Sequence, residues 1–327
     1  MGMKEYVAKK LFAAALTIFG SICINFLIFR ILPGDPLRMI IKDPRVKPEA
    51  MERLRRRFGL DKPLWVQFIV YLTRLAQGDM GMSFWQKRPV LEVVLDRLWP
   101  TVLLVGSAFL ISLVIGVVTG AIVGWKRRSK MSALIYSVSL VVYMIPTFWL
   151  GILLLLVFGY WFGLFPLGGM KTPGIKPGPI GYWLDVLNHM VLPLIALIFW
   201  YFGEYVVVMR SAMLDVLTED YITTARAKGL RERVIMWDHA VRNALLPVTT
   251  LTAINAGWIV AGAIEAEIVF SWPGVGRLIY DALMKRDYPL LQGTFLVLTV
   301  SVVLANLLAD IVYGYLDPRV REEAAKL

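Results

Sequence analysis

The side chains that most often carry catalysis or hold metal ions are scarce in this sequence and widely spaced. The two histidines, His189 and His239, lie far apart, and the single cysteine, Cys23, lies within the first apolar segment. The chain contains no HExxH zinc motif, no GxSxG nucleophile elbow and no GxxxxGK[ST] phosphate loop. Glu265 and Glu267 form the only close acidic pair near the end of an apolar segment. We therefore predict no catalytic residue, no metal site and no cofactor site in this chain.

Composition places the chain in a membrane. Of its 327 residues, 58% are hydrophobic and only 18% are charged, which is too apolar for a soluble domain of this length. The net charge of +11 raises the question of nucleic acid, but the basic residues lie in loops that flank apolar segments. Retention of those loops at an anionic cytoplasmic surface explains the charge, so no nucleic-acid partner is expected.

Six apolar runs are long enough to cross a hydrocarbon core about 30 Å thick, which needs about 20 helical residues. We therefore predict an all-α membrane protein with six transmembrane helices and with both termini cytoplasmic. Pro146 is expected to kink the third span. The predicted spans are residues 11–29, 98–125, 131–162, 186–208, 244–264 and 288–309.

Three glycines in the second predicted span, Gly116, Gly120 and Gly124, follow one another at four-residue intervals. This spacing places three bare backbone patches on one helix face and favours close helix packing in lipid. The sequence leaves open whether the neighbouring helix belongs to this chain or to another one.

The loops between the spans differ in length and charge. Residues 30–97 are predicted to form a large external subdomain with helices at 48–57, 63–77 and 88–98. This loop is basic, against the usual bias, but it exceeds the length over which charge sets orientation. Residues 171–185 are too rich in proline and glycine to be helical. In the loop at 265–287, Ser271 is expected to cap a short helix whose first turn contains Pro273.

The loop from Thr218 to Pro247 is predicted to be a structured cytoplasmic elbow. Thr218 and Asp220 favour a helix start, and Gly229 can end that helix in the left-handed conformation. A second helical run is expected from residue 231 to the proline. The small face made by Ala225 and Ala227 would let another protein approach the backbone closely. The alternative is an amphipathic helix that rests on lipid headgroups.

The predicted spans contain no group that could couple transport to an ion gradient. Their central parts lack Asp, Glu, Lys and Arg, whereas ion-driven carriers need an ionisable or coordinating group there. The energy for transport must therefore come from another protein, and we expect that protein to act on the elbow. Two rival classes stay open: a channel or ion-coupled carrier, which would transport alone, and a membrane enzyme.

Several short motifs, in order along nearly the whole chain, resemble the membrane subunits of bacterial dipeptide/oligopeptide ABC importers, and specifically the first of their two permease subunits. The elbow sequence DYITTARAKGL at 220–230, followed by HAVRNALLP at 239–247, resembles the signature loop of that family. The other motifs are LPGDP at 32–36, GLDKP at 59–63, Gly78-Asp79 with Gly81 and Ser83, IPTFWLG at 145–151, FSWPG at 270–274, RDYP at 286–289 and DPR at 317–319.

The elbow departs from the broader ABC-importer pattern of Glu-Ala-Ala, then Gly, then Ile-x-Leu-Pro. Thr223 and Thr224 occupy the first two positions, and Leu246-Pro247 comes late. These departures resemble the peptide branch of the family. They leave the expected ATPase-docking role in place.

The resemblance implies the transmembrane domain of a type I ABC importer in the cytoplasmic (inner) membrane of a prokaryote, built as one permease domain over residues 1–327. It implies a heterodimer with a second homologous permease subunit, two ABC ATPase subunits that bind ATP and Mg²⁺, and an extracytoplasmic substrate-binding protein. The cargo expected is di- or oligopeptides, with oligosaccharides or nickel chelates as alternatives. The residues expected to dock the ATPase are Tyr221, Thr224, Ala225, Arg226, Ala227, Lys228, Gly229 and Leu230, and those expected at an external gate or binding-protein contact are Glu265, Glu267, Trp272, Pro273 and Gly274.

Overall fold

The computed structural model describes residues 3–31, 61–174 and 178–316, and all of its named elements are helices. Of these, η1 and η2 are π-helices and η3 is a 3-10 helix. In chain order the elements are α1 (Met3–Ile31), α4 (Leu64–Ala76), α5 (Val90–Trp125), α6 (Lys130–Met144), α7 (Thr147–Leu154), η1 (Leu155–Trp161), α8 (Pro179–Val216), α9 (Asp220–Ala227), α10 (Glu232–Val234), η2 (Ile235–Val241), α11 (Arg242–Trp258), η3 (Ile259–Ala261), α12 (Ile264–Val269), α13 (Val275–Met284) and α14 (Tyr288–Leu316).

Five of the described helical stretches are long and apolar enough to cross a membrane, and a sixth crossing results if α6 and α7 with η1 count as one span. That pair is bent by 97°. Pro146 separates the two helices, and the residue before it, Ile145, adopts an extended conformation (φ −74°, ψ 126°) because a proline disfavours the helical region for its predecessor. The predicted kink is therefore a break of nearly a right angle.

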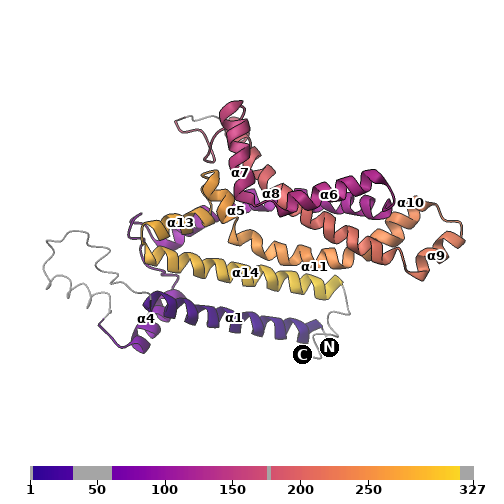
Figure 1. Ribbon diagram of the computed structural model, residues 1–327. Coiled ribbons are helices and arrows are strands. Elements are labelled where there is room, and N and C mark those ends of the chain that lie inside the picture. The colour runs from indigo at the N-terminus through magenta and orange to yellow at the C-terminus, as the bar shows by residue number, and fades with distance from the viewer. Residues whose placement is uncertain (1–2, 32–60, 175–177, 317–327) are drawn as a thin grey trace.

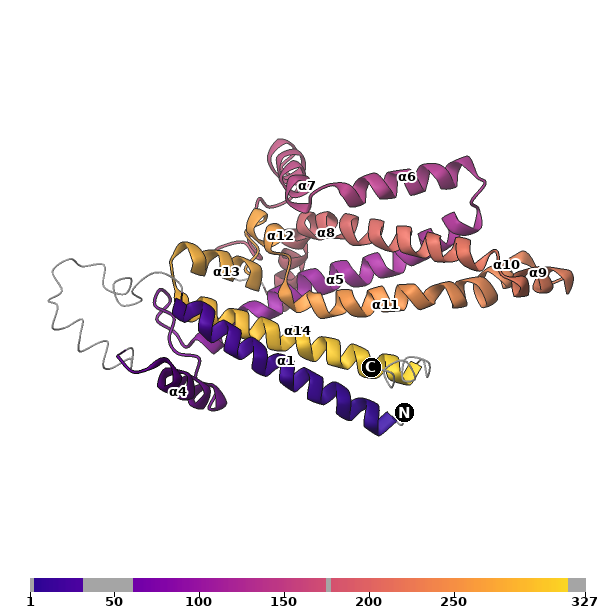
Figure 2. The same ribbon diagram turned by 60° about the horizontal axis from the view of Figure 1, so that its bottom comes forward.

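The long helices run roughly side by side, so the bundle has two opposite ends (Figures 1 and 2). The start of α1, the end of α14 and α9 lie at one end of the bundle, while α4 and α13 lie at the opposite end (Figure 1). Helix α8 packs along α5 and also contacts α6 and α11, and α1 packs along α14. Near the chain ends, α1 is fastened to α14 by an ion pair between Lys10 Nζ and Asp310 Oδ2 at 2.8 Å.

The partner of the glycine face on α5 is α8 of the same chain, which answers the question the sequence left open. A Cβ at Gly116 would come within 2.6 Å of the Cβ of Tyr205, and one at Gly120 within 2.8 Å of the Cβ of Met209. Gly124 faces Met213 in the same way. Bare backbone at these positions lets the two helices approach more closely than any side chain would allow.

At the end of the bundle that carries α13, a buried carboxylate ties distant segments together. Asp287, just before α14, accepts hydrogen bonds from Ser83 Oγ (2.6 Å) and from the backbone N–H of Trp85 (3.0 Å) with one oxygen. Its other oxygen accepts from the N–H of Leu290 at 3.2 Å. The segment after α4 is therefore anchored to the start of α14, and two of the sequence motifs meet here.

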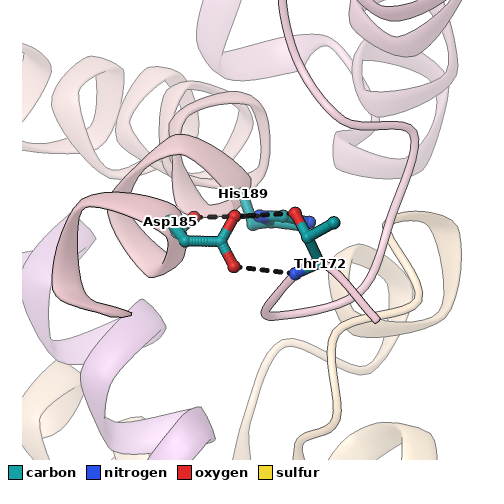
Figure 3. A network of polar contacts seen from close by, with 3 residues as sticks. All are labelled: Thr172, Asp185 and His189. Carbon is teal, nitrogen blue, oxygen red and sulfur yellow. Dashed lines mark hydrogen bonds and ion pairs between the residues drawn. The ribbon is translucent and has the colours of Figure 1, made fainter. Parts of the chain in front are cut away.

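A second polar network anchors the loop before α8 (Figure 3). Asp185 accepts hydrogen bonds from the N–H (2.7 Å) and the hydroxyl (2.8 Å) of Thr172, and His189 Nδ1 lies 2.9 Å from the Asp185 carbonyl oxygen. His189 is buried, so it acts within this network as a local hydrogen-bonding group.

Several predicted boundaries were wrong. The expected helix at 88–98 and the second span form one helix, α5, and α8 begins at Pro179, inside the segment expected to be non-helical. Pro247 lies inside α11 and does not end a helix. The motifs at 32–36 and 317–319 and the helix expected at 48–57 lie outside the described residues.

Candidate functional site: the elbow and the opposite end of the bundle

The elbow consists of α9, a turn at Gly229, α10 and η2. Gly229 has φ +75°, a left-handed conformation that glycine adopts without the strain a Cβ brings, and its N–H donates to the carbonyl of Arg226. The left-handed end was predicted. The predicted helix-starting side chains were not found in that role, because the N-cap is Glu219, which makes no side-chain capping bond, and the Thr218 hydroxyl donates to the Asp215 carbonyl.

One face of α9 packs against the chain itself. Ile222 and Ala225 are buried and belong to one hydrophobic cluster with Ile235 and Met236 of η2. The small face expected from Ala225 and Ala227 is therefore divided, with Ala225 turned inward and Ala227 exposed. Ala225 cannot contact an outside protein in this conformation. The predicted docking residues that remain exposed are Tyr221, Thr224, Arg226, Ala227, Lys228, Gly229 and Leu230.

Arg226 connects three parts of the elbow region. Its guanidinium donates to both carboxylate oxygens of Glu232 in α10, at 3.0 and 3.4 Å, and it lies 5.7 Å from the ring centroid of Trp125, the last residue of α5. The ion pair is exposed and therefore contributes about 0 to 1 kcal/mol. The contact with Trp125 is a cation–π interaction that joins α9 to a membrane-spanning helix.

The exposed face of the elbow offers hydrogen-bond donors and positive charge. Arg226, Lys228, Arg231 and Arg233 are all exposed. The Tyr221 phenol is protonated at neutral pH, and partial desolvation raises its pKa further above its ordinary value, opposed by a hydrogen bond from Asn243. The face can therefore donate hydrogen bonds to an acidic or carbonyl-bearing partner surface.

At the opposite end, the predicted gate residues are mostly interior. Glu267 is fully buried, and its Oε1 accepts a hydrogen bond from Thr101 Oγ1 of α5 at 2.7 Å. Trp272 is also fully buried and donates from Nε1 to the Pro100 carbonyl at 2.8 Å. Neither side chain presents a surface to a binding protein in this conformation, whereas Glu265 is exposed.

The turn that contains Pro273 and Gly274 is held by the same carboxylate. Glu267 Oε2 accepts from the N–H of Arg277 at 3.1 Å, and Gly274 lies so close that a Cβ there would clash with the Glu267 carboxylate. Helix α13 begins after Gly274, so Ser271 does not cap it and Pro273 precedes its first turn. Its first N–H, from Val275, donates to Thr101 Oγ1 at 2.8 Å.

Thr101 therefore makes two buried hydrogen bonds, and its replacement by the isosteric valine tests them. We expect Thr101→Val to lower the free energy of unfolding by about 2 kcal/mol, because it leaves buried groups of Glu267 and Val275 without that partner. The matched control is Thr17→Val, since Thr17 is exposed and donates only to its own helix. Thermal unfolding of the two variants in detergent should separate them; equal melting temperatures would contradict the role of Thr101.

A polar contact inside the bundle was missed by the sequence analysis. Glu204 of α8 accepts a hydrogen bond from Asn255 Nδ2 of α11 at 2.8 Å. The predicted span stopped at residue 208, four residues after Glu204, but α8 continues to Val216. The carboxylate consequently lies well inside the helix. The sequence signal was present, since Glu204 is the only Asp, Glu, Lys or Arg between residues 186 and 209.

Within the described ranges, no three His, Cys, Asp or Glu side chains gather where they could hold a metal ion. The arrangement instead pairs an exposed elbow at one end of a helical bundle with a tightly hydrogen-bonded turn at the other. Similarity to known proteins identifies the family of this chain. Residues 116–322 match the family described as "binding-protein-dependent transport system inner membrane component", and residues 3–105 match its N-terminal component.

The chain belongs to this permease family.

Curated relatives indicate the branch of the family to which the permease is similar in sequence. The permease is 36% identical over 98% of its length to the whole of the di/tripeptide transport system permease protein DppB of Pseudomonas aeruginosa. It is 34% identical over 98% of its length to the whole of the dipeptide transport system permease protein DppB of Escherichia coli. It is also 34% identical over 97% of its length to 99% of the oligopeptide transport system permease protein AppB of Bacillus subtilis.

The predicted family and fold class are therefore confirmed. The permease is a multi-pass inner-membrane protein of the dipeptide/oligopeptide ABC type and is a transport subunit, not an enzyme. Because the matches cover nearly the whole chain, the elbow, the glycine face and the turn at Pro273 and Gly274 all lie within the family's shared region.

Proposed function

We propose that this permease is one membrane subunit of an ATP-driven importer of di- and oligopeptides, and that α9 with Gly229 is the helix that docks an ATPase subunit. The observation that supports this most is the exposed elbow at the end of the bundle where α1 begins and α14 ends, joined to the spans by buried and charged contacts (Figure 1). The names of the relatives, which are peptide permeases, support the cargo class.

The remaining parts of the complex are supplied by other chains. A second homologous permease would complete the pathway, two ATPase subunits would bind ATP and Mg²⁺, and an external binding protein would deliver the peptide. The end that carries α9 and both termini would face the cytoplasm, in line with the basic loop at 126–130.

The chain's own contribution is to transmit a movement. ATP can shift the complex between inward-open and outward-open states only by its different affinity for the two, and closure of the ATPases would move α9 as a rigid body. Arg226 and Trp125 would carry this movement to α5, and Ile222 and Ala225 would carry it through η2 to α11. Helix α8 would follow α5 because the glycine face locks the two helices together.

Reconstitution into liposomes tests this proposal. The permease, its partner permease, the ATPases and the binding protein should together take up trialanine in the presence of ATP and Mg²⁺. Omission of any one component should abolish uptake. Uptake by this permease alone would favour the channel or ion-driven carrier. Uptake of an oligosaccharide or a nickel chelate, with none of trialanine, would keep the machinery and overturn the peptide cargo.

Substitution of two nearby alanines distinguishes the folding of the elbow from its docking to the ATPase. Ala225→Leu should push α9 away from η2, because Ala225 is buried, and so speed trypsin cleavage of the elbow in the isolated permease by about tenfold, as expected when about 1.4 kcal/mol of local stability is lost. Ala227→Leu should leave that cleavage rate unchanged, since Ala227 is exposed, yet reduce uptake by the full complex. If both variants were cleaved alike, the division of the small face would be wrong.

A further inference from the structure

Glu204 is an ionisable group inside a membrane-spanning helix. The next charged residues of α8 are Asp185, 19 residues earlier, and Arg210, six residues later. At 1.5 Å per helical residue these lie about 28 Å and about 9 Å away along the axis. A carboxylate in this position is costly to keep and is retained in membrane proteins mainly for function.

Among the described residues, Glu204 has a neutral partner but no cationic one. Asn255 Nδ2 donates to Oε2 at 2.8 Å, and none of the ion pairs between described side chains includes Glu204. One amide hydrogen bond does not offset the cost of removing a carboxylate from water. Glu204 is only partly buried, so a cation from outside the chain can reach it.

Tyr143 of α6 interacts electrostatically with Glu204, so an aromatic ring lies near this carboxylate. Trp200 precedes Glu204 by one helical turn on the same face of α8, and its ring lies 6.3 Å from that of Tyr143 in α6. Gly203 allows this approach, since a Cβ there would come within 2.5 Å of the Cβ of Tyr143. Trp200 and Tyr143 are both partly exposed. Three helices therefore contribute to one half-open cluster of a carboxylate, an amide and two rings.

We propose that Tyr143, Trp200, Glu204 and Asn255 form an amine site, which binds the protonated amino group of a peptide in transit. A carboxylate attracts an ammonium group by charge, and aromatic faces attract it through their quadrupole. Every linear peptide with a free amino terminus carries this group, so such a site accepts cargo regardless of side chains. The inference rests on the proposed peptide cargo and names residues that act on it.

The test measures weak binding without the binding protein, whose own selectivity would mask the effect. Saturation-transfer NMR is applied to the complex of both permeases and both ATPases in lipid nanodiscs, without nucleotide. The probes are trialanine and N-acetyl-trialanine, which differ in the charge of the amino terminus. The variants are Glu204→Gln, which keeps an acceptor for Asn255, and Asp215→Asn, which removes an exposed carboxylate from the same helix.

We expect wild type and Asp215→Asn to bind trialanine about tenfold more tightly than N-acetyl-trialanine, as one contact worth about 1.4 kcal/mol would give. Glu204→Gln should bind both probes equally. The inference is overturned if wild type shows no preference, if it binds neither probe, or if Glu204→Gln keeps the preference.

Two other outcomes also overturn the inference and name a different role. Loss of the partner permease from the Glu204→Gln complex would show that a cation of that subunit faces the carboxylate. If Glu204→Gln bound both probes more weakly by the same factor, and so kept the preference, Glu204 would serve only to join α8 to α11. Failure of the peptide cargo itself is recognised separately, because wild-type liposomes with the binding protein would then take up no trialanine.

Discussion

Replacement of Gly229 by tryptophan is expected to abolish ATP-driven uptake while the permease still folds. Gly229 is exposed, and a Cβ built on it meets no atom within 4 Å, so the indole would extend from the elbow toward whatever docks there. A bulky group at the centre of a close-packed contact costs about 3 kcal/mol or more, which corresponds to about a 100-fold loss of docking. Uptake by liposomes and copurification of the ATPases with the permease would measure the effect.

The control must share the strain of a side chain at positive φ. Gly163 has φ +61°, also meets nothing within 4 Å, and follows η1 outside the elbow. Gly163→Trp should therefore lose the same small amount of stability, about 1 to 2 kcal/mol, while it keeps uptake and ATPase binding. Normal uptake by the Gly229 variant would remove the docking role from α9. Equal loss in both variants would indicate strain alone.

The elbow shows how far a single sequence can be interpreted. Gly229 was predicted as a left-handed helix end because that conformation is a local property of the residue. The burial of Ala225 was not predicted, because it depends on η2, which follows later in the chain and folds back onto α9. The spacing of Ile222 and Ala225, three apart on one helix face, was the available signal for an inward face.

The spans show a similar division. Their apolar runs identified the transmembrane helices, since the hydrocarbon core imposes a length and excludes charge. The apolar runs did not predict the helix ends, because α5 and α8 each continue beyond their apolar run. A helix can extend into water, since its backbone hydrogen bonds form within the helix itself. Pro146 predicted a disruption, but the 97° angle is set by the packing of α7 against other helices.

The acidic residues were the least predictable. Glu267 was expected at a gate or an outer contact because it follows the fifth apolar run, yet its partner Thr101 lies 166 residues earlier. Glu204 lies four residues before the predicted end of its span, and α11 brings Asn255 to it from 51 residues later. Such pairings arise from tertiary packing, and a single sequence contains no record of them.

The second prediction with a large expected effect concerns the glycine face of α5, because this face holds together the two helices that are proposed to transmit movement from the elbow. Of the three glycines, Gly120 lies nearest to the backbone of α8: a Cβ there would lie 2.8 Å from the Cβ of Met209 and 2.9 Å from the carbonyl oxygen of Val206. That oxygen belongs to the backbone and cannot move aside without shifting α8. Gly120→Ala should therefore cost about 1 to 3 kcal/mol.

A leucine at position 120 adds three further carbons where none fits, so Gly120→Leu should yield no stably folded permease in detergent, as judged by gel filtration and thermal unfolding. Gly20→Leu in α1 is the matched control, because a Cβ at Gly20 meets no atom within 4 Å. It should fold like wild type. If Gly120→Leu also folded and transported, α5 and α8 would have to separate without loss, and the route by which the elbow moves α8 would have to bypass the glycine face.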